Sequence, residues 1–357
     1  MIARVGPACH AGAVTARLAA LLLTPLLTLA LGAATVPAHA ESAPGAAEPA
    51  VTGYALESTP PRVIERNADG LTTVTVVASL LHPSGRRVST PGARPRRLLA
   101  AAHRSGLRAE LLLSGWNNHI QDFDARAAHR LLSSPRRIRR VAGQLARAVR
   151  TQSWDGVNLD LERLRRADAP GLVRLAAQLQ RRMPAERTVS VDVSARTSLR
   201  AYRQAGYRLR ELGEVVDLVQ LMAYDQHGPT WSGPGPIGAL GWQRAALRAA
   251  LRVVPADRLD LGVAGYGYTW PRAGTGRSIT VAGARRLVRR DGAVARWRPA
   301  VGEWSARLSD GTRLWWSDRR SYAARVRLAE EHDLHGLAVW RLGSADRLTR
   351  PLIRPGS

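Results

Sequence analysis

The sequence is almost free of cysteine and entirely free of lysine. Its single cysteine, Cys9, lies close to the N-terminus, so the rest of the chain has no thiol for a disulfide or for a thiolate metal site. The histidines are scattered without the pair spacings of common zinc sites, and no Gly-x-Gly-x-x-Gly follows an early strand. We therefore predict that the protein needs no metal and no cofactor.

Long apolar runs are also missing beyond residue 40, which predicts no stable membrane insertion. The one candidate run, 18–31, follows Arg17, is interrupted by Pro25, and is succeeded by the small-residue sequence Ala38-His39-Ala40. A basic start, a short apolar stretch and such a cleavage site are typical of a secretory signal peptide. We assign residues 1–40 to it and expect a secreted protein, extracellular or associated with the cell wall.

All 53 basic residues are arginine, against 28 acidic residues, for a net charge of +25. A basic surplus can indicate nucleic-acid binding, but here the arginines are dispersed along amphipathic segments such as 135–150 and are not interleaved with aromatic residues. We therefore expect no nucleic-acid partner. Two alternatives remain open: the arginines attract an anionic cell-wall polymer, or they only cover solvated helix faces.

An Ala/Pro/Ser/Glu-rich stretch, residues 41–52, predicts a disordered linker, and strands and helices alternate after it through 53–357. The expected strands are 51–56, 72–81, 107–114, 157–162, 188–194, 218–224, 259–265 and 336–340. The expected helices between them include 93–105, 135–150, 170–183, 198–212, 242–253 and 321–332. This rhythm favours an α/β fold, a (β/α)8 TIM barrel, over a doubly wound open sheet. Residues 271–315 interrupt it and predict a small inserted α+β lobe between strand 7 and helix 7.

One expected strand carries acids on a single face. From Val157 to Glu162 the residues alternate, so three apolar side chains point one way and Asn158, Asp160 and Glu162 point the other. Two neighbouring carboxylates repel when both are ionised, so one of them retains a proton near neutral pH, as a general acid requires. An exposed strand edge would show the same alternation. The repeated strand–helix units favour a barrel interior and make Glu162 the leading catalytic candidate.

The chain resembles glycoside hydrolase family 18, the family of chitinases and related N-acetylglucosaminidases. Its Asp-x-x-Asp-x-Asp-x-Glu pattern corresponds to residues 155–162, with Asn158 where chitinases carry aspartate. Three further motifs follow in order: Met222-Ala223-Tyr224-Asp225, Tyr266-Gly267-Tyr268-Thr269-Trp270, and Trp340 in the last strand. Segments such as Tyr224-Asp225-Gln226-His227 and Trp315-Trp316-Ser317-Asp318 are closest to the bacterial spore-germination, cortex-lytic branch.

The resemblance implies a substrate-assisted, retaining glycosidase, an exception to the usual two-carboxylate mechanism. Glu162 would protonate the glycosidic oxygen, Asp160 would orient the substrate's acetamido group with Asn158 behind it as a hydrogen-bond partner, and Tyr224 and Asp225 would assist. The implied substrate-binding residues are Trp340, Met222, Tyr54, Trp116 and Tyr266.

The implied partner is a polysaccharide containing N-acetylglucosamine, peptidoglycan or chitin, cleaved at β-1,4 linkages by a monomeric enzyme. Two other readings stay open. One is a non-catalytic chitin- or peptidoglycan-binding protein on the same barrel. The other is a metal-assisted hydrolase with Asp155, Asp160 and Glu162 as ligands.

Overall fold

The computed structural model describes residues 49–349, so the predicted signal peptide and most of the predicted linker lie outside the described residues. The first strand, β1 (Ala50–Ala55), begins inside that predicted linker. Its residues 50–53 pair in parallel register with 336–339 of the last strand. The linker boundary at residue 52 was therefore wrong, because the backbone of residues 50–52 is needed to close the ring of strands.

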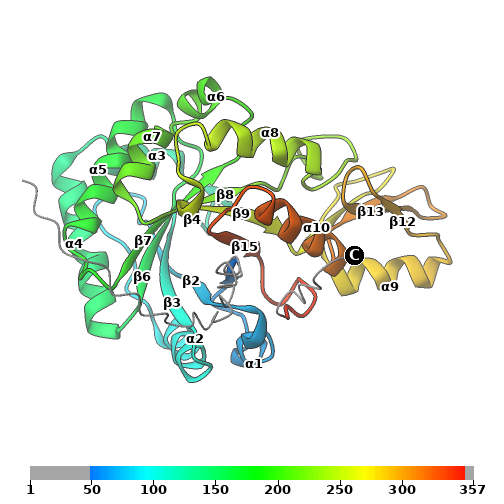
Figure 1. Cartoon of the computed structure of the whole chain (residues 1–357), viewed down its shortest axis with the longest axis horizontal. Helices are drawn as coiled ribbons and strands as arrows, with labels where there is room; N and C mark the ends of the chain where they lie inside the picture. Colours follow the sequence, from blue (N-terminus) through cyan, green and yellow to red (C-terminus); the bar gives the residue numbers. More distant parts are fainter. Residues whose placement is uncertain (1–48, 350–357) are drawn as a thin grey trace, which may run out of the picture. The chain divides into compact units, whose positions relative to one another are not determined.

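Eight parallel strands form a closed barrel in the order β1-β15-β9-β8-β7-β6-β3-β2. Besides β1 they are β2 (Thr73–Leu80), β3 (Arg108–Ser114), β6 (Gly156–Asp160), β7 (Thr188–Ser194), β8 (Leu218–Met222), β9 (Leu259–Ala264) and β15 (Gly336–Trp340). Helices surround the ring (Figure 1). The predicted TIM barrel is confirmed.

The helices of the barrel follow from local sequence signals. They are α1 (Pro61–Glu65), α2 (Ala93–Arg104), α3 (Ala125–Leu132), α4 (Pro135–Gln152), α5 (Ala169–Gln180), α6 (Leu199–Gln204), α7 (Leu209–Val215), α8 (Leu240–Ala250) and α10 (Arg319–Glu330). In α4, Ser134 caps the N-terminus by accepting a hydrogen bond from the Arg137 amide, and Pro135 occupies the first turn. Its buried residues recur three and four apart, as the sequence predicts for one apolar face.

The single helix expected over 198–212 is instead two, α6 and α7, and Gly206 lies between them. Its φ of 85° is in the left-handed region, and a Cβ atom there would lie 2.6 Å from the Leu164 Cβ. A glycine is therefore required where the chain turns tightly against its neighbour.

The two faces of the barrel strands differ because side chains alternate along a strand. Outward residues such as Val157 and Leu159 are buried against the helices, whereas inward residues include polar groups. Glu110 illustrates the inward face: its carboxylate accepts hydrogen bonds from Thr188 at 2.6 Å and from Ser190 at 2.9 Å. Burial raises the pKa of Glu110, and these hydroxyl donors offset part of that increase.

The insertion forms its own antiparallel sheet, in the order β11-β10-β14-β13-β12, with helix α9 (Val281–Asp291). Its strands are β10 (Tyr266–Trp270), β11 (Ser278–Thr280), β12 (Arg296–Arg298), β13 (Glu303–Arg307) and β14 (Arg313–Trp316). The small sheet confirms the predicted insertion between β9 and α10. It begins at Tyr266, earlier than the expected residue 271, because β10 pairs with β14 and not with the barrel.

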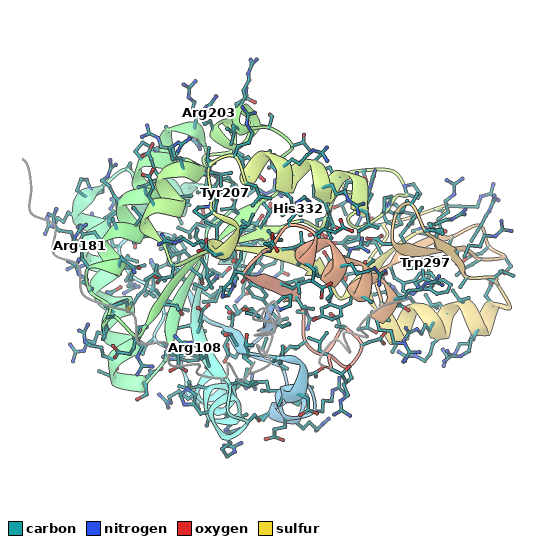
Figure 2. All side chains as sticks on the ribbon, in the orientation of Figure 1. Arg108, Arg181, Arg203, Tyr207, Trp297 and His332 are labelled. Atoms are coloured by element: carbon teal, nitrogen blue, oxygen red, sulfur yellow. The ribbon has the colours of Figure 1, made fainter. Side chains whose placement is uncertain are left out.

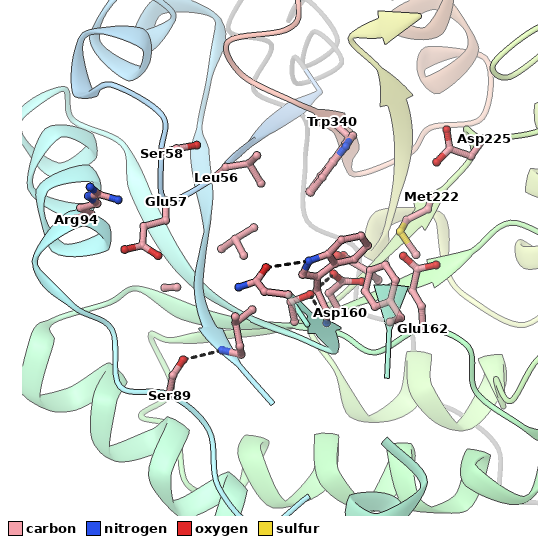
Figure 3. Close-up of a pocket in the computed structure, with 18 of the residues that line it drawn as sticks. Leu56, Glu57, Ser58, Ser89, Arg94, Asp160, Glu162, Met222, Asp225 and Trp340 are labelled. Atoms are coloured by element: carbon pink, nitrogen blue, oxygen red, sulfur yellow. Dashed lines mark hydrogen bonds between the residues drawn. The ribbon is translucent and has the colours of Figure 1, made fainter. Parts of the chain in front are cut away.

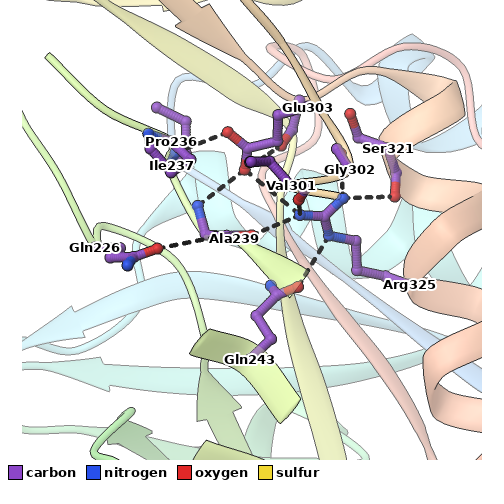
Figure 4. Close-up of polar contacts among 12 residues, drawn as sticks. Gln226, Pro236, Ile237, Ala239, Gln243, Val301, Gly302, Glu303, Ser321 and Arg325 are labelled. Atoms are coloured by element: carbon purple, nitrogen blue, oxygen red, sulfur yellow. Dashed lines mark hydrogen bonds and ion pairs between the residues drawn. The ribbon is translucent and has the colours of Figure 1, made fainter. Parts of the chain in front are cut away.

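A buried polar network ties this lobe to the barrel (Figure 4). Glu303 of β13 accepts hydrogen bonds from the Ile237 and Gly238 amides, both at 2.8 Å. Arg325 of α10 lies 3.5 Å from the Glu303 carboxylate, and both side chains are 1% exposed. Arg325 also donates to Gln243 Oε1 at 3.0 Å, so three segments distant in sequence meet at one ion pair.

The surface carries the excess of basic residues. Arg181 and Arg203 lie at the outer edge of the helical layer, and Trp297 lies in the lobe (Figure 2). The Arg320 guanidinium lies 4.4 Å from the centre of the Trp297 ring.

Within residues 49–349, no helix combines the length and the apolarity needed to cross a bilayer.

Candidate active site

A cleft of about 590 Å³ opens at the carboxyl ends of the barrel strands, where TIM barrels place functional groups. Its volume lies within the range of about 300–1,000 Å³ that is usual for ligand sites. Its lining residues come from several strand ends and the loops that follow them: Leu56, Glu57, Ser58, Val77, Ala78, Leu80, Ser89, Arg94, Ser114, Trp116, Asn118, Phe123, Asp160, Glu162, Asp192, Met222, Tyr224, Asp225 and Trp340. Figure 3 shows Glu162 and Asp225 toward one end and Glu57 and Arg94 toward the other.

Glu162 is the second residue after β6, which ends at Asp160 and is shorter than the expected strand. Burial is the main cause that raises the pKa of Glu162 to about 7, and the nearby charge of Asp225 adds to it. The positive charges of Arg163 and Arg196 lower this pKa and offset part of the increase. A carboxyl group with this pKa is protonated in a substantial fraction of molecules at neutral pH. Glu162 therefore has the protonation behaviour of a general acid, in a cleft that a ligand can enter.

Asp160 is almost fully buried, and only one of its carboxylate oxygens is hydrogen-bonded within the described chain. Its Oδ2 accepts from Ser114 Oγ at 3.1 Å, whereas Oδ1 has no partner there. Burial first, and then the charges of Glu162 and Asp192, raise the pKa of Asp160 well above its ordinary value. Asp160 and Glu162 therefore titrate as a pair that readily retains one proton. The unsatisfied Oδ1 is available for a polar group of a ligand.

Asp192, on β7, is a cleft residue that sequence reasoning missed. It accepts hydrogen bonds from the Tyr54 hydroxyl at 2.6 Å and from the Asn158 amide at 2.9 Å. Burial raises its pKa to about 7, although these two donors lower it. The signal was present, because residues 188–194 alternate polar and apolar side chains as residues 157–162 do.

Two predicted residues take different places from those expected. Asn158 was expected to hydrogen-bond Asp160; its amide instead donates to Asp192 and to Ser190 Oγ, and the residue is fully buried below the cleft. Tyr54 was expected to contact substrate, but it is 1% exposed and packs 5.4 Å from the Trp340 ring. Asn158 lies in the middle of β6, so its inward side chain lies beneath those at the strand end. Tyr54, near the end of β1, is covered because it packs against Trp340 and donates its hydroxyl to Asp192.

Tyr224 and Asp225 follow β8 and line the cleft. Asp225 has a left-handed backbone with φ of 58°, and its Oδ1 accepts hydrogen bonds from the hydroxyls of both Tyr266 and Tyr268. Packing around this carboxyl raises the pKa of Asp225, and the two hydroxyls offset part of the effect. Tyr266 was predicted to contact substrate; it is buried, donates to Asp225 and packs edge-on against Tyr224 at 6.3 Å.

Trp340, Met222 and Trp116 line the cleft, the position that substrate binding would require of them. Trp116 is fixed at both ends: its backbone amide donates to Ser114 Oγ, and its indole Nε1 donates to Asn118 Oδ1, both at 3.1 Å. Such rigid aromatic surfaces suit the apolar faces of sugar rings. Ser114 and Tyr268, which hold Asp160 and Asp225, were not anticipated, because their roles depend on which strands are neighbours.

The metal-assisted alternative required Asp155, Asp160 and Glu162 to share one ion. Asp155 lies before β6, where it pairs with Arg187 and accepts a hydrogen bond from the Ala109 amide at 2.8 Å. Five residues of extended strand separate it from Asp160 by about 16 Å, so those three side chains cannot ligate a common metal.

Comparison with known proteins agrees with this geometry. The sequence model of the glycosyl hydrolases family 18 matches residues 72–345. The uncharacterized glycosylase YvbX of Bacillus subtilis is 23% identical over 276 residues, which cover 74% of this chain and 80% of YvbX. The cortical fragment-lytic enzyme of the same organism is 27% identical over 243 residues, covering 64% of this chain but 55% of that enzyme. The chain thus spans about half the length of the second relative.

Solved structures show the same fold. A chitinase from Chromobacterium violaceum superposes with a TM-score of 0.76 at 24% identity, covering 84% of this chain and 95% of the chitinase. The spore cortex-lytic enzyme SleL of Bacillus cereus superposes with a TM-score of 0.73 at 18% identity, covering 83% and 71%. At such identities the superpositions support the fold alone, whereas the family match extends over most of the chain. The protein belongs to glycoside hydrolase family 18.

Proposed function

We propose that this glycoside hydrolase cleaves β-1,4 linkages that follow N-acetylglucosamine in peptidoglycan or chitin, by a substrate-assisted, retaining mechanism. Sequence relatives described as a cortical fragment-lytic enzyme and as a class V chitinase support these two substrates. Both polymers carry the 2-acetamido group that the mechanism uses in place of a protein nucleophile.

The partly unsatisfied Asp160 beside the protonatable Glu162 is the observation that carries this proposal. Glu162 donates its proton to the glycosidic oxygen as the bond to the anomeric carbon breaks. The substrate's acetamido oxygen attacks that carbon, while Asp160 accepts the acetamido N–H and stabilises the positive charge of the oxazolinium ion. Burial and neighbouring acids raise the pKa of Tyr224, so its hydroxyl stays protonated and able to donate to the acetamido oxygen. Water then opens the ring, returning a proton to Glu162.

The pKa of Glu162 predicts the alkaline limb of the pH profile. Because the acid must be protonated, kcat/KM should fall about tenfold per pH unit above roughly pH 7. Asp225→Asn removes a charge that raises this pKa and should move the limb to lower pH, whereas Arg196→Gln removes a charge that lowers it and should move the limb upward. Initial rates on a soluble chitooligosaccharide between pH 4 and 10 measure both shifts; movement of both limbs in the same direction would contradict the assignment.

The acetamido requirement supplies the test of the mechanism. Wild-type protein should release products from N-acetylated chitooligosaccharides or from purified peptidoglycan, and none from cellooligosaccharides, which have the same linkage without the acetamido group. Mass spectrometry of the products, with and without EDTA, measures this, and EDTA should have no effect. Cleavage of cellooligosaccharides at a comparable rate would exclude substrate assistance.

A non-catalytic glycan-binding protein on the same barrel is the other candidate. The raised pKa of Glu162 disfavours it, because a binding protein has no use for a protonatable carboxyl poised near neutral pH. Retention of glycans without any cleavage in the experiment above would favour the binding protein.

A further inference from the structure

Arg94 is the only basic residue among the described residues that line the cleft. The other charged lining residues are acidic: Glu57, Asp160, Glu162, Asp192 and Asp225. An exposed arginine is unremarkable in a chain with 53 basic residues, but this one stands in a cleft whose other ionisable groups have the opposite charge. The position of Arg94 among these acids therefore suggests that it binds a negatively charged group of a ligand.

Within residues 49–349, Arg94 makes no ion pair and no hydrogen bond, although Glu57 lines the same end of the cleft (Figure 3). Arg94 lies in the first turn of α2, a helix of 12 residues with no acidic residue in that turn and no capping side chain. The positive end of the helix dipole thus adds to the guanidinium charge. Both features favour an anion at this end of the cleft.

The two candidate polymers differ in this respect. Chitin consists of neutral N-acetylglucosamine and offers a cation in the cleft nothing to pair with. In peptidoglycan, alternate sugars are N-acetylmuramic acid, whose O3-lactyl group ends in a carboxylate or is joined to a peptide that itself carries carboxylates. Arginine is the side chain best shaped for a carboxylate, since its planar guanidinium forms two parallel hydrogen bonds with it.

We propose that Arg94 binds a carboxylate of the substrate and makes the cleft selective for glycans that contain N-acetylmuramic acid. The inference rests on the proposed function and narrows its substrate to peptidoglycan. Glu162, at the opposite end of the lining, protonates the scissile bond, and Arg94 recognises the charged substituent of a neighbouring sugar. Arg94 is thus a specificity-determining residue that takes no part in the chemical step.

Calorimetric binding to the inactivated protein tests this without depending on hydrolysis. Glu162→Gln and the double variant Glu162→Gln/Arg94→Gln are titrated with a chitotetraose and with a peptide-free GlcNAc–MurNAc tetrasaccharide. Two further ligands are titrated in the same way. One is the same tetrasaccharide with its carboxyls amidated, and the other is the tetrasaccharide with its stem peptides attached. Arg97→Gln on the same background is the matched control, because Arg97 is an exposed arginine of α2 that does not line the cleft.

Arg94→Gln should lower the ratio of affinities, GlcNAc–MurNAc over chitotetraose, by about 10- to 100-fold, and amidation should abolish the difference. A loss confined to the peptide-bearing glycan would still support carboxylate recognition and would assign it to the stem peptide. If neither the peptide-free nor the peptide-bearing glycan loses affinity relative to chitotetraose, or if Arg97→Gln causes an equal loss, the proposal would be overturned. Failure of the wild-type protein to cleave either glycan would instead count against the proposed function.

Discussion

Glu162→Gln should lower kcat on a productive glycan by about 10²- to 10⁴-fold with little change in KM. Glutamine keeps the shape and hydrogen-bonding capacity of the side chain but has no proton to transfer to the glycosidic oxygen. Because Asp160 and Tyr224 remain in place, the cleft should still bind the glycan and position its acetamido group. Initial rates of product release, measured with wild type and variant at pH 6, give both constants.

The control for this variant is Glu186→Gln. Glu186 is an exposed glutamate next to Arg187, which pairs with Asp155 at the opposite end of the barrel from the cleft. The Glu186→Gln protein should retain the wild-type kcat and KM, and its Tm should equal that of the Glu162→Gln protein. A Glu162→Gln protein that keeps more than about a tenth of the wild-type kcat would show that another group supplies the proton.

Arg325→Met should lower the stability of the fold by about 3–5 kcal/mol, because it leaves the Glu303 carboxylate buried without its ion-pair partner. Arg325 is 1% exposed and donates hydrogen bonds to Gln243 and to the backbone carbonyls of residues 238, 301, 302 and 321 (Figure 4). Methionine fills part of the volume but satisfies none of these acceptors. The Tm in thermal unfolding should fall by roughly 6–20 °C, at about 2–4 °C per kcal/mol.

Arg244→Met is the matched control, since Arg244 pairs with Glu331 at 3.0 Å on an exposed surface. Loss of such a pair changes stability by less than about 1 kcal/mol. The double variant Arg325→Met/Glu303→Gln separates the causes, because glutamine removes the charge and keeps an oxygen that the buried amides can bind. If the unpaired charge is responsible, this variant should recover part of the lost stability. Equal Tm values for the Arg325 and Arg244 variants would contradict the assigned role of the buried pair.

The Glu303–Arg325 network also reaches the active site through one further contact. Gln243, which accepts from Arg325, donates its amide to the Ala223 carbonyl at 2.7 Å. Ala223 precedes Tyr224, so the position of the cleft tyrosine depends on contacts made by the lobe and α10. Nothing in the local sequence around Tyr224 indicates this dependence.

The sequence alone determined the alternation of strands and helices and the barrel, and it singled out Glu162 as the candidate acid. Strand alternation placed Asp160 and Glu162 on one face, and the rule that functional groups gather at the carboxyl ends of strands selected Trp116, Tyr224 and Trp340. The barrel is confirmed and these residues line one cleft, because both inferences depend on periodicity and chain order, which are local properties.

The tertiary structure decided which side chains meet. Several contacts of the site join side chains from different strands, and they depend on barrel register and strand order. These pairs are Asp192 with Asn158, Tyr266 with Asp225, and Ser114 with Asp160. The same closure placed Tyr54 beneath Trp340 and, among the residues that the structure describes, left Arg94 without an ion pair in an acidic cleft. Burial, charge proximity and hydrogen bonding set each pKa in the site, and all three depend on distances that arise only when separate segments of the chain come together.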